Sequence, residues 1–216
     1  MPIVVWELLA LGLLAFLFVL LTAGTRRMGP VAGLVRDIAY AVFALAVSLS
    51  MVIRVNGYGG ERLGVGVQHL WPASRVLALV TVVGTVVLVA LCHLRGRRTV
   101  LTRNMVQLMV VYPAWAYVQH LLVMGVFLNL VRDGFGAGTA VAVGGLVFGA
   151  LHLNHGRGFV VLTSAVGLAW SWAFLSAPNL LPLAISHGIL ATLTYSWVRG
   201  EDKWADIFTR GRLRPD

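Results

Sequence analysis

Three histidines in the second half of the chain are the residues best suited to chemistry. His120 follows Gln119, His152 lies four residues after Phe148, and His187 lies in the last apolar segment. An ionisable side chain in an apolar membrane segment usually faces a bundle interior or a water-filled cavity. An imidazole near neutral pH can act as a base, a hydrogen-bond donor or a metal ligand. The sequence therefore predicts that these three histidines converge on a shared pocket.

The composition indicates a membrane protein. Of the 216 residues, 59% are hydrophobic and only 12% are charged, and this charged fraction is about half that of a typical soluble domain. The net charge is +9, but the arginines fall in short loops between apolar runs, as the positive-inside rule describes. We therefore expect a lipid bilayer, and not a nucleic acid, as the partner of these charges. The single cysteine, Cys92, cannot form an internal disulfide.

The order of apolar runs predicts an all-α, polytopic transmembrane helical bundle with about seven spans, since a span needs about 20 apolar residues. The predicted spans cover residues 3–23, 38–53, 76–94, 105–130, 139–153, 159–175 and 180–198. The stretch 54–74 predicts a glycine-rich loop in which Trp71-Pro72 forms an interfacial anchor and a turn.

The charge distribution predicts an outside N-terminus and a cytoplasmic C-terminus. In that orientation the only basic residues in outside loops are Arg54, Arg62, Arg75 and Arg132. We divide the chain into three N-terminal spans (residues 1–104), a four-helix core (105–198) and a basic amphipathic cytoplasmic tail (199–216).

Helical spacing gives the histidines small neighbours. His152 shares a helix face with Phe148, Gly149 and Gly145, and glycines four residues apart allow a second helix to approach closely. Taken singly, each intramembrane histidine is equally well explained as a hydrogen bond between helices, but three of them on the last four spans favour a site. Simple counting places His152 near the inner end of its span and His187 nearer the outer third of its own.

Three short motifs follow one another in the last four spans. Residues 119–124 read Gln-His-Leu-Leu-Val-Met, residues 148–152 read Phe-Gly-Ala-Leu-His, and residues 187–191 read His-Gly-Ile-Leu-Ala. This order resembles the CPBP family of intramembrane CAAX-type prenyl endopeptidases and bacteriocin-processing or immunity proteins, whose motifs are Glu-Glu-x-x-x-Arg, Phe-x-x-x-His and His-x-x-x-Asn. The resemblance covers residues 105–197. It implies a CPBP-like core in the last four spans and cleavage of a membrane-tethered peptide or protein.

The motifs depart from the family pattern at the residues that carry charge. In the family the first glutamate is understood to activate water, and the histidines and the asparagine to stabilise the oxyanion. Here Gln119 and His120 stand in place of the two glutamates, Met124 in place of the arginine and Ala191 in place of the asparagine. The last four spans contain no Asp or Glu, so the glutamate mechanism cannot operate unchanged.

Two mechanisms remain open at this point. In the first, His120 is the general base, Gln119 orients the water or the scissile carbonyl, and His152 and His187 donate to the oxyanion. In the second, His120, His152 and His187 bind a divalent metal such as zinc, which activates the water. The side chains expected to contact substrate are those around the histidines: Phe148, Trp115 and Met124.

We therefore predict a divergent intramembrane endopeptidase. The first alternative is a catalytically inactive CPBP-like scaffold or immunity protein that binds a membrane partner in the same cavity. Haem binding by paired histidines on neighbouring spans is a further alternative. A transporter is the last, although no span has a mid-membrane break with charged residues.

Overall fold

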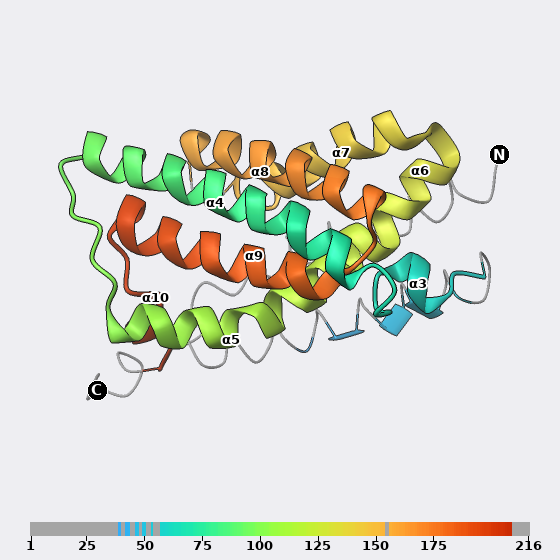
Figure 1. The fold of residues 1–216 in the computed structure, drawn as a ribbon, viewed down its shortest axis with the longest axis horizontal. Coiled ribbons are helices and arrows are strands. Elements are labelled where there is room, and N and C mark those ends of the chain that lie inside the picture. The colour runs from blue at the N-terminus through green and yellow to red at the C-terminus, as the bar shows by residue number, and fades with distance from the viewer. Residues whose placement is uncertain are drawn as a thin grey trace.

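The computed structural model describes residues 57–153 and 156–208, together with isolated positions between residues 39 and 53. Within this part of the chain every regular element is a helix (Figure 1). The elements are, in chain order, α3 (Gly60–Leu63), α4 (Leu70–Leu94), α5 (Arg103–His120), the π-helix η1 (Leu121–Leu128), α6 (Asn129–Phe135), α7 (Ala137–Ala150), α8 (Arg157–Ser176), α9 (Leu180–Leu193), the π-helix η3 (Thr194–Arg199) and α10 (Lys203–Phe208).

The predicted third to seventh spans are confirmed as helices. They correspond to α4, to the continuous α5–η1–α6 helix, to α7, to α8 and to the continuous α9–η3 helix. Four of these are long and apolar enough to cross a membrane, and α7, with 14 residues, is shorter. The first two predicted spans lie outside the described residues, apart from isolated positions of the second. The count of seven and the orientation of the termini therefore stay predictions.

Two local expectations have different outcomes. The loop expected over residues 54–74 is wrong in extent, because it contains α3 and because α4 already begins at Leu70. Trp71 and Pro72 therefore lie in the first turn of α4, where a proline is tolerated because the backbone N–H that it lacks has no helical partner there. In the predicted tail a short helix, α10, forms, and residues 209–216 lie outside the described part.

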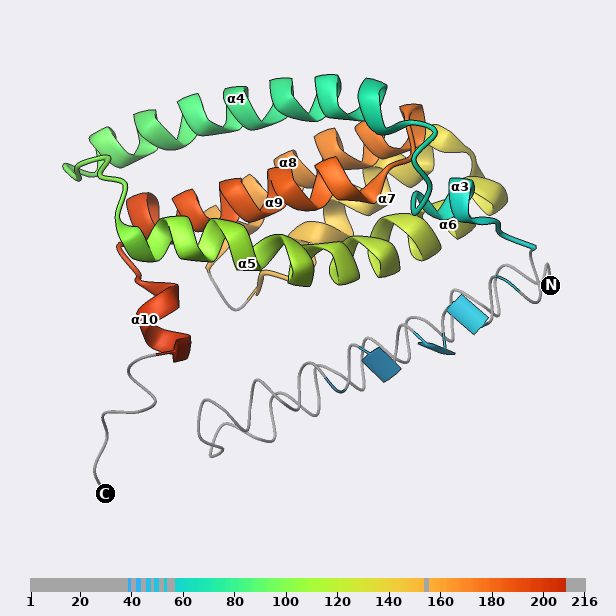
Figure 2. The same ribbon diagram turned by 60° about the horizontal axis from the view of Figure 1, so that its bottom comes forward.

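Helix α9 is the central element of the described bundle. It packs against α5 on one side and α4 on the other (Figure 2). The α9–η3 helix is 67% buried over its most apolar stretch, whereas α4 is only 17% buried. The outer side of α4 exposes apolar side chains such as Leu79, Val82 and Val86, a surface suited to lipid. The histidine on α9 is therefore placed in the interior of the bundle.

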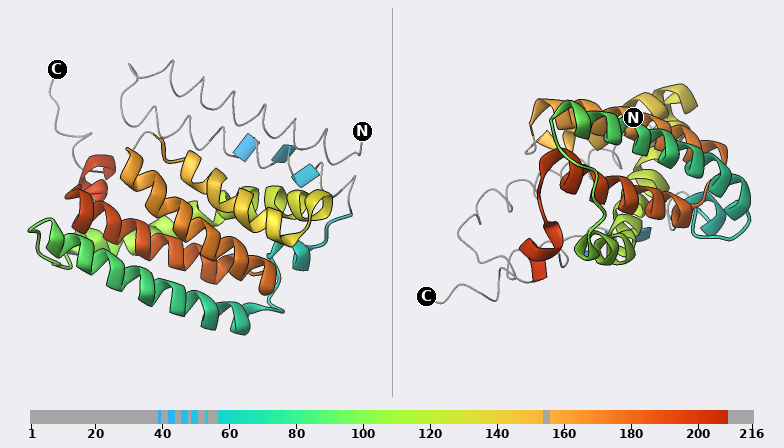
Figure 3. Two further views of the ribbon diagram at one scale, coloured as in Figure 1. Left: turned by 90° about the horizontal axis from the view of Figure 1, so that it is seen from above. Right: turned by 60° about the vertical axis from the view of Figure 1, so that its left-hand side comes forward.

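Glycines bring α7 and α8 into close contact, as the left view of Figure 3 shows. A Cβ atom on Gly167 would lie 2.7 Å from the Cβ of Phe148 and 3.2 Å from the Cα of Gly145. A Cβ on Gly149 would lie 3.0 Å from the carbonyl oxygen of Val160. The close approach predicted from the Gly145/Gly149 spacing is therefore confirmed, and α8 is the helix that uses it.

The short length of α7 determines where His152 lies. A helix of this length rises about 21 Å, less than the hydrocarbon thickness of about 30 Å. The chain leaves the helix after Ala150 and turns back into α8. His152, in that turn, lines the same pocket as His187. The offset in depth expected from simple counting is thereby removed.

The packing of α7 on α8 predicts a large difference between two glycines of α8. Gly167→Val should destabilise the bundle by about 1–3 kcal/mol, because its side chain would overlap α7. Gly158→Val is the matched control, since a Cβ there meets nothing within 4 Å. Reversible unfolding of both variants in detergent micelles would measure the difference. Equal losses in the two variants would contradict the close packing.

Candidate active site

His120 on α5 and His187 on α9 form a buried pair. Nε2 of His120 lies 3.0 Å from Nδ1 of His187, and the two residues are 0% and 3% exposed. The residue after His187 explains how the helices come so close. A Cβ on Gly188 would lie 2.7 Å from Cγ of Pro113, on α5. The missing side chain at Gly188 therefore lets α5 and α9 approach until the two imidazoles meet.

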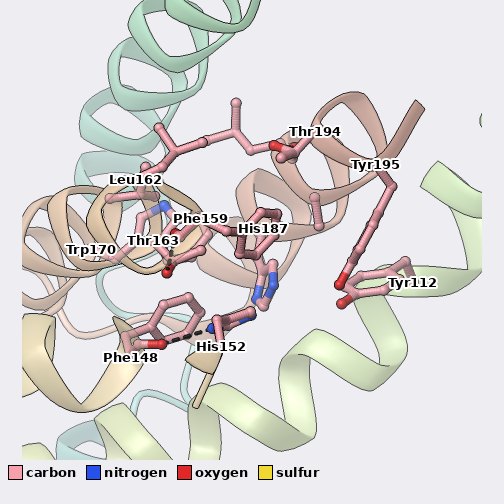
Figure 4. Close-up of a pocket in the computed structure, with 13 residues that line it drawn as sticks. Tyr112, Phe148, His152, Phe159, Leu162, Thr163, Trp170, His187, Thr194 and Tyr195 are labelled. Carbon is pink, nitrogen blue, oxygen red and sulfur yellow. Dashed lines mark hydrogen bonds between the residues drawn. The ribbon is translucent and has the colours of Figure 1, made fainter. Parts of the chain in front are cut away.

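A small cavity of about 40 Å³ lies beside this pair. It has room for a few water molecules, since one water needs about 10–15 Å³ measured in this way. His152 and His187 both line it, as Figure 4 shows. His120 is not among the lining residues. The full lining is Tyr112, Phe148, His152, Phe159, Leu162, Thr163, Val166, Trp170, His187, Leu190, Ala191, Thr194 and Tyr195.

The backbone fixes the tautomer of His152. Its Nδ1 lies 2.8 Å from the carbonyl oxygen of Phe148. A carbonyl only accepts hydrogen bonds, so Nδ1 carries the proton and donates it. In the neutral ring the other nitrogen, Nε2, is then an acceptor. His152 therefore brings to the pocket a ring nitrogen that can take up a proton.

The surroundings of His120 fix the tautomer of His187. Nδ1 of His120 is buried and has no hydrogen-bond partner among the described residues. An orphaned buried N–H is rarer and more costly than an unsatisfied acceptor, so we assign the His120 proton to Nε2. That nitrogen then donates to Nδ1 of His187. His187 consequently carries its own proton on Nε2 and can donate a hydrogen bond.

Aromatic rings enclose the histidine pair. The ring centroid of Phe148 lies 5.6 Å from that of His120, in a stacked arrangement, and that of Trp170 lies 4.9 Å from that of His187. The ring of Tyr112 meets His187 edge-on at 5.5 Å. All three of these rings also line the pocket, so the surroundings of the pair on that side are largely aromatic.

Trp170 also belongs to a polar network that the sequence did not reveal. Its Nε1–H donates to the hydroxyl of Ser186, at 3.1 Å, and the hydroxyl of Thr81 on α4 donates to the same oxygen, at 2.8 Å. Ser186 directly precedes His187, so this network fixes the start of the histidine-bearing turn. The only signal in the sequence was the pair Ser186-His187, which does not identify its partners on other helices.

The remaining predicted site residues lie in different places. Phe148 lines the pocket, whereas Trp115 is half-buried and outside the lining. Met124 is fully buried, and its sulfur accepts a hydrogen bond from Ser171 at 3.6 Å. The side-chain oxygen of Gln119 is buried, has no hydrogen-bond partner among the described residues, and lies outside the pocket lining.

The geometry does not fit the predicted metal centre. Within residues 57–153 and 156–208, no three or more His, Cys, Asp or Glu side chains are arranged to hold a metal ion. The physical reason lies in the pair itself. The facing nitrogens of His120 and His187 point at each other and share one proton, whereas ligands of zinc point at a common ion. We derive no step through a metal.

A match to a known protein family supports the resemblance predicted from the motifs. Residues 102–193 match the family model of the type II CAAX prenyl endopeptidase Rce1-like proteins. The resemblance predicted from the motifs is therefore confirmed over the segment that carries all three histidines. Members of that family are described as type II CAAX prenyl endopeptidases. Together with the four apolar helices, the match identifies an integral membrane protein.

A second similarity is of a different kind. The cobalt transport protein CbiM of Kyrpidia tusciae (strain DSM 2912 / NBRC 15312 / T2) is 30% identical over 166 residues, which cover 73% of this chain. The aligned part spans 63% of that relative, somewhat less than two thirds of its length. No solved structure gives a significant match to the chain.

The buried pair predicts coupled stability effects. His120→Leu and His187→Leu should each cost about 1–3 kcal/mol, because each leaves one buried ring nitrogen unpaired. The double variant should cost less than the two together, with a coupling energy of about 1 kcal/mol. Reversible unfolding in micelles would measure all three. Additive losses would mean that the two rings do not share a hydrogen bond.

Proposed function

We propose that this protein is a divergent intramembrane endopeptidase that cleaves a membrane-tethered, prenylated peptide or protein. The observation that carries the proposal is a small cavity lined by His152 and His187, with His120 hydrogen-bonded to His187. His152 and His187 are its catalytic residues, and His120 is a positioning residue. The family match over residues 102–193 supports the same reaction class.

The two tautomers supply complementary roles. Nε2 of His152 removes a proton from a water molecule as the water oxygen bonds to the scissile carbonyl carbon. The Nε2–H of His187 donates to the carbonyl oxygen as negative charge develops there. When the carbon–nitrogen bond breaks, the His152 imidazolium returns its proton to the leaving amine. The reaction therefore consumes one water and needs no carboxylate.

His120 acts through His187 in this mechanism. The sequence predicted that His120 is the general base, but the residue is fully buried and lies outside the pocket lining, so His152 takes that role in this mechanism. By donating to Nδ1, His120 holds the His187 proton on the opposite nitrogen, as the second partner of a catalytic histidine commonly does. Gln119, to which the sequence assigned an orienting role, has no part in this mechanism because it also lies outside the pocket lining.

Two other functions compete with this one. An inactive relative that binds a prenylated partner would need the same cavity, but it would not need one histidine to accept a proton and another to donate one. Measuring cleavage therefore distinguishes the inactive binding protein from the protease. Cobalt transport, which the name of the curated relative states for that protein, has no support from the arrangement of ligating side chains among the described residues.

Cleavage by purified protein in liposomes tests the proposal. The probe is a dansyl-labelled peptide ending in S-farnesylcysteine followed by three apolar residues, with products followed by mass spectrometry. His152→Ala and His187→Ala should each lower kcat/KM by about 10²–10⁴-fold, because they remove the base and the oxyanion donor respectively. His93→Ala, an exposed histidine in the last turn of α4, is the matched control and should cleave normally.

The same measurements distinguish the protease from an inactive binding protein. Peptide binding without cleavage by the wild type would support the inactive binding protein. Undiminished cleavage by His152→Ala would remove the proposed mechanism. Circular dichroism and gel filtration of each variant would show that the bundle is intact.

A further inference from the structure

Two arginines converge on one carbonyl oxygen at the end of the α9–η3 helix. Nη1 of Arg95 donates to the carbonyl of Val198 at 3.0 Å, and Nη1 of Arg97 donates to the same oxygen at 2.9 Å. Both arginines lie on the loop that follows α4, and this loop passes the end of the helix (Figure 1). A helix C-terminus carries partial negative charge and attracts a cation. Capping therefore explains one of the two arginines but does not require the second.

The two guanidinium groups are close to each other and lack an acidic partner. Their Nη1 atoms lie within about 6 Å of each other because they share one acceptor, and like charges at this distance repel. Within residues 57–153 and 156–208, neither group forms an ion pair with a carboxylate. A guanidinium has five N–H donors, and the bond to Val198 uses one from each arginine. Both side chains are exposed, so donors and positive charge remain available to a ligand.

The carboxylates of the neighbouring segment do not neutralise this end of the bundle. Glu201 pairs with the two basic side chains that lie two residues away on either side of it. Asp202 accepts a hydrogen bond from the side-chain nitrogen of Asn104 at 2.7 Å. Residues 93–104 and 198–206 together contain six Arg or Lys side chains but three carboxylates. An excess of positive charge therefore remains here even when every carboxylate has a cationic partner.

Apolar side chains beside the two arginines place the loop at a lipid surface. Leu94 is 83% exposed, and Val100 and Leu101 are 57% and 59% exposed. The indole N–H of Trp197, on η3, donates to the carbonyl of Val100 at 2.9 Å, and tryptophan is enriched at membrane interfaces. The loop joins two helices that are long and apolar enough to cross a membrane. Its guanidinium groups therefore lie at the level of the phospholipid headgroups.

We propose that Arg95 and Arg97 bind the phosphate group of an anionic phospholipid. The two unesterified oxygens of a phosphodiester can each accept from one guanidinium, in charge-assisted hydrogen bonds that are stronger than those to a carbonyl. The bound anion offsets the repulsion between the two cations. The excess of positive charge favours an anionic headgroup over a choline headgroup. The site does not depend on the proposed protease activity.

The hydrogen bonds already present prepare the loop for this ligand. The bonds to Val198 and from Trp197 hold the loop against the helix end at two points. Less conformational entropy is then lost when the lipid binds, because the two guanidinium groups are already close together. The same helix carries His187, so a lipid bound at Arg95 and Arg97 stabilises the end of the helix that bears this histidine.

Native mass spectrometry of the full-length protein in detergent micelles tests the site. The probes are dioleoylphosphatidylglycerol and, as the neutral comparison, dioleoylphosphatidylcholine. The wild type should bind the first phosphatidylglycerol molecule with an apparent Kd about 5–10-fold lower than that for phosphatidylcholine. Arg95→Gln and Arg97→Gln should each lower this preference several-fold, and the double variant should bring the two Kd values within about twofold of each other. Arg97→Lys keeps the charge but loses the planar fork, so its preference should lie between those of the wild type and Arg97→Gln.

Two other arginines provide matched controls. Arg98→Gln removes the same charge from an exposed position on the same loop. Arg75→Gln removes it near the start of α4, where the guanidinium lies 4.9 Å from the ring of Trp71. Both variants should keep most of the preference. Equal losses in Arg97→Gln and Arg98→Gln would indicate a diffuse electrostatic attraction and overturn the site, as would equal Kd values for the two lipids in the wild type.

Inorganic phosphate distinguishes a lipid from a free anion. Millimolar phosphate should not displace phosphatidylglycerol, compared with sodium chloride at the same ionic strength, because the acyl chains also hold the lipid. Displacement by phosphate alone would assign the site to free phosphate and overturn the lipid. In each single variant the other arginine still donates to Val198, so the helix cap is preserved, and circular dichroism would show that the bundle is intact.

Discussion

A hydrogen bond between two imidazoles in an apolar interior is the constraint on which the described bundle depends. Water is scarce at this depth, so a ring nitrogen that finds no protein partner stays unsatisfied. The bond requires α5 and α9 to approach more closely than ordinary side chains permit, and Gly188 against Pro113 provides that approach. Once the helices are this close, Phe148 and Trp170 can enclose the pair. The close approach of α5 and α9 therefore determines both the chemistry of the site and the packing of the bundle.

The same constraint explains why a helix ends early. Non-helical backbone is tolerated at membrane depth only where protein or a water-filled cavity surrounds it. The turn after α7 satisfies this condition, since His152 donates to the carbonyl of Phe148, one of the last acceptors of the helix. A full-length α7 would carry its end away from His187. The α8 glycine, Gly167, which accepts Phe148 closely, secures the short helix against its neighbour.

Hydropathy and length were enough to predict four described helices that could cross a membrane and the shorter apolar helix α7, because lipid imposes these properties on each segment separately. The convergence of the histidines was also predictable from motif order. Which of them line the pocket was not predictable, because whether His120 faces the pocket depends on how α5 is rotated, and a helical period leaves several rotations open. For the same reason the sequence did not reveal that Trp115 and Met124 lie outside the lining of this cavity.

The neutral character of the site follows from what replaces the charged residues of the family motifs. A buried charge that loses its partner is destabilising by about 3–5 kcal/mol, so an arginine without its glutamates would be costly here. Met124 stands at that position as a fully buried, uncharged side chain, and Gln119 is uncharged as well. With no formal charge left in the core, neutral imidazoles are the groups in the pocket able to both accept and donate protons. Opposite tautomers at His152 and His187 divide these two tasks.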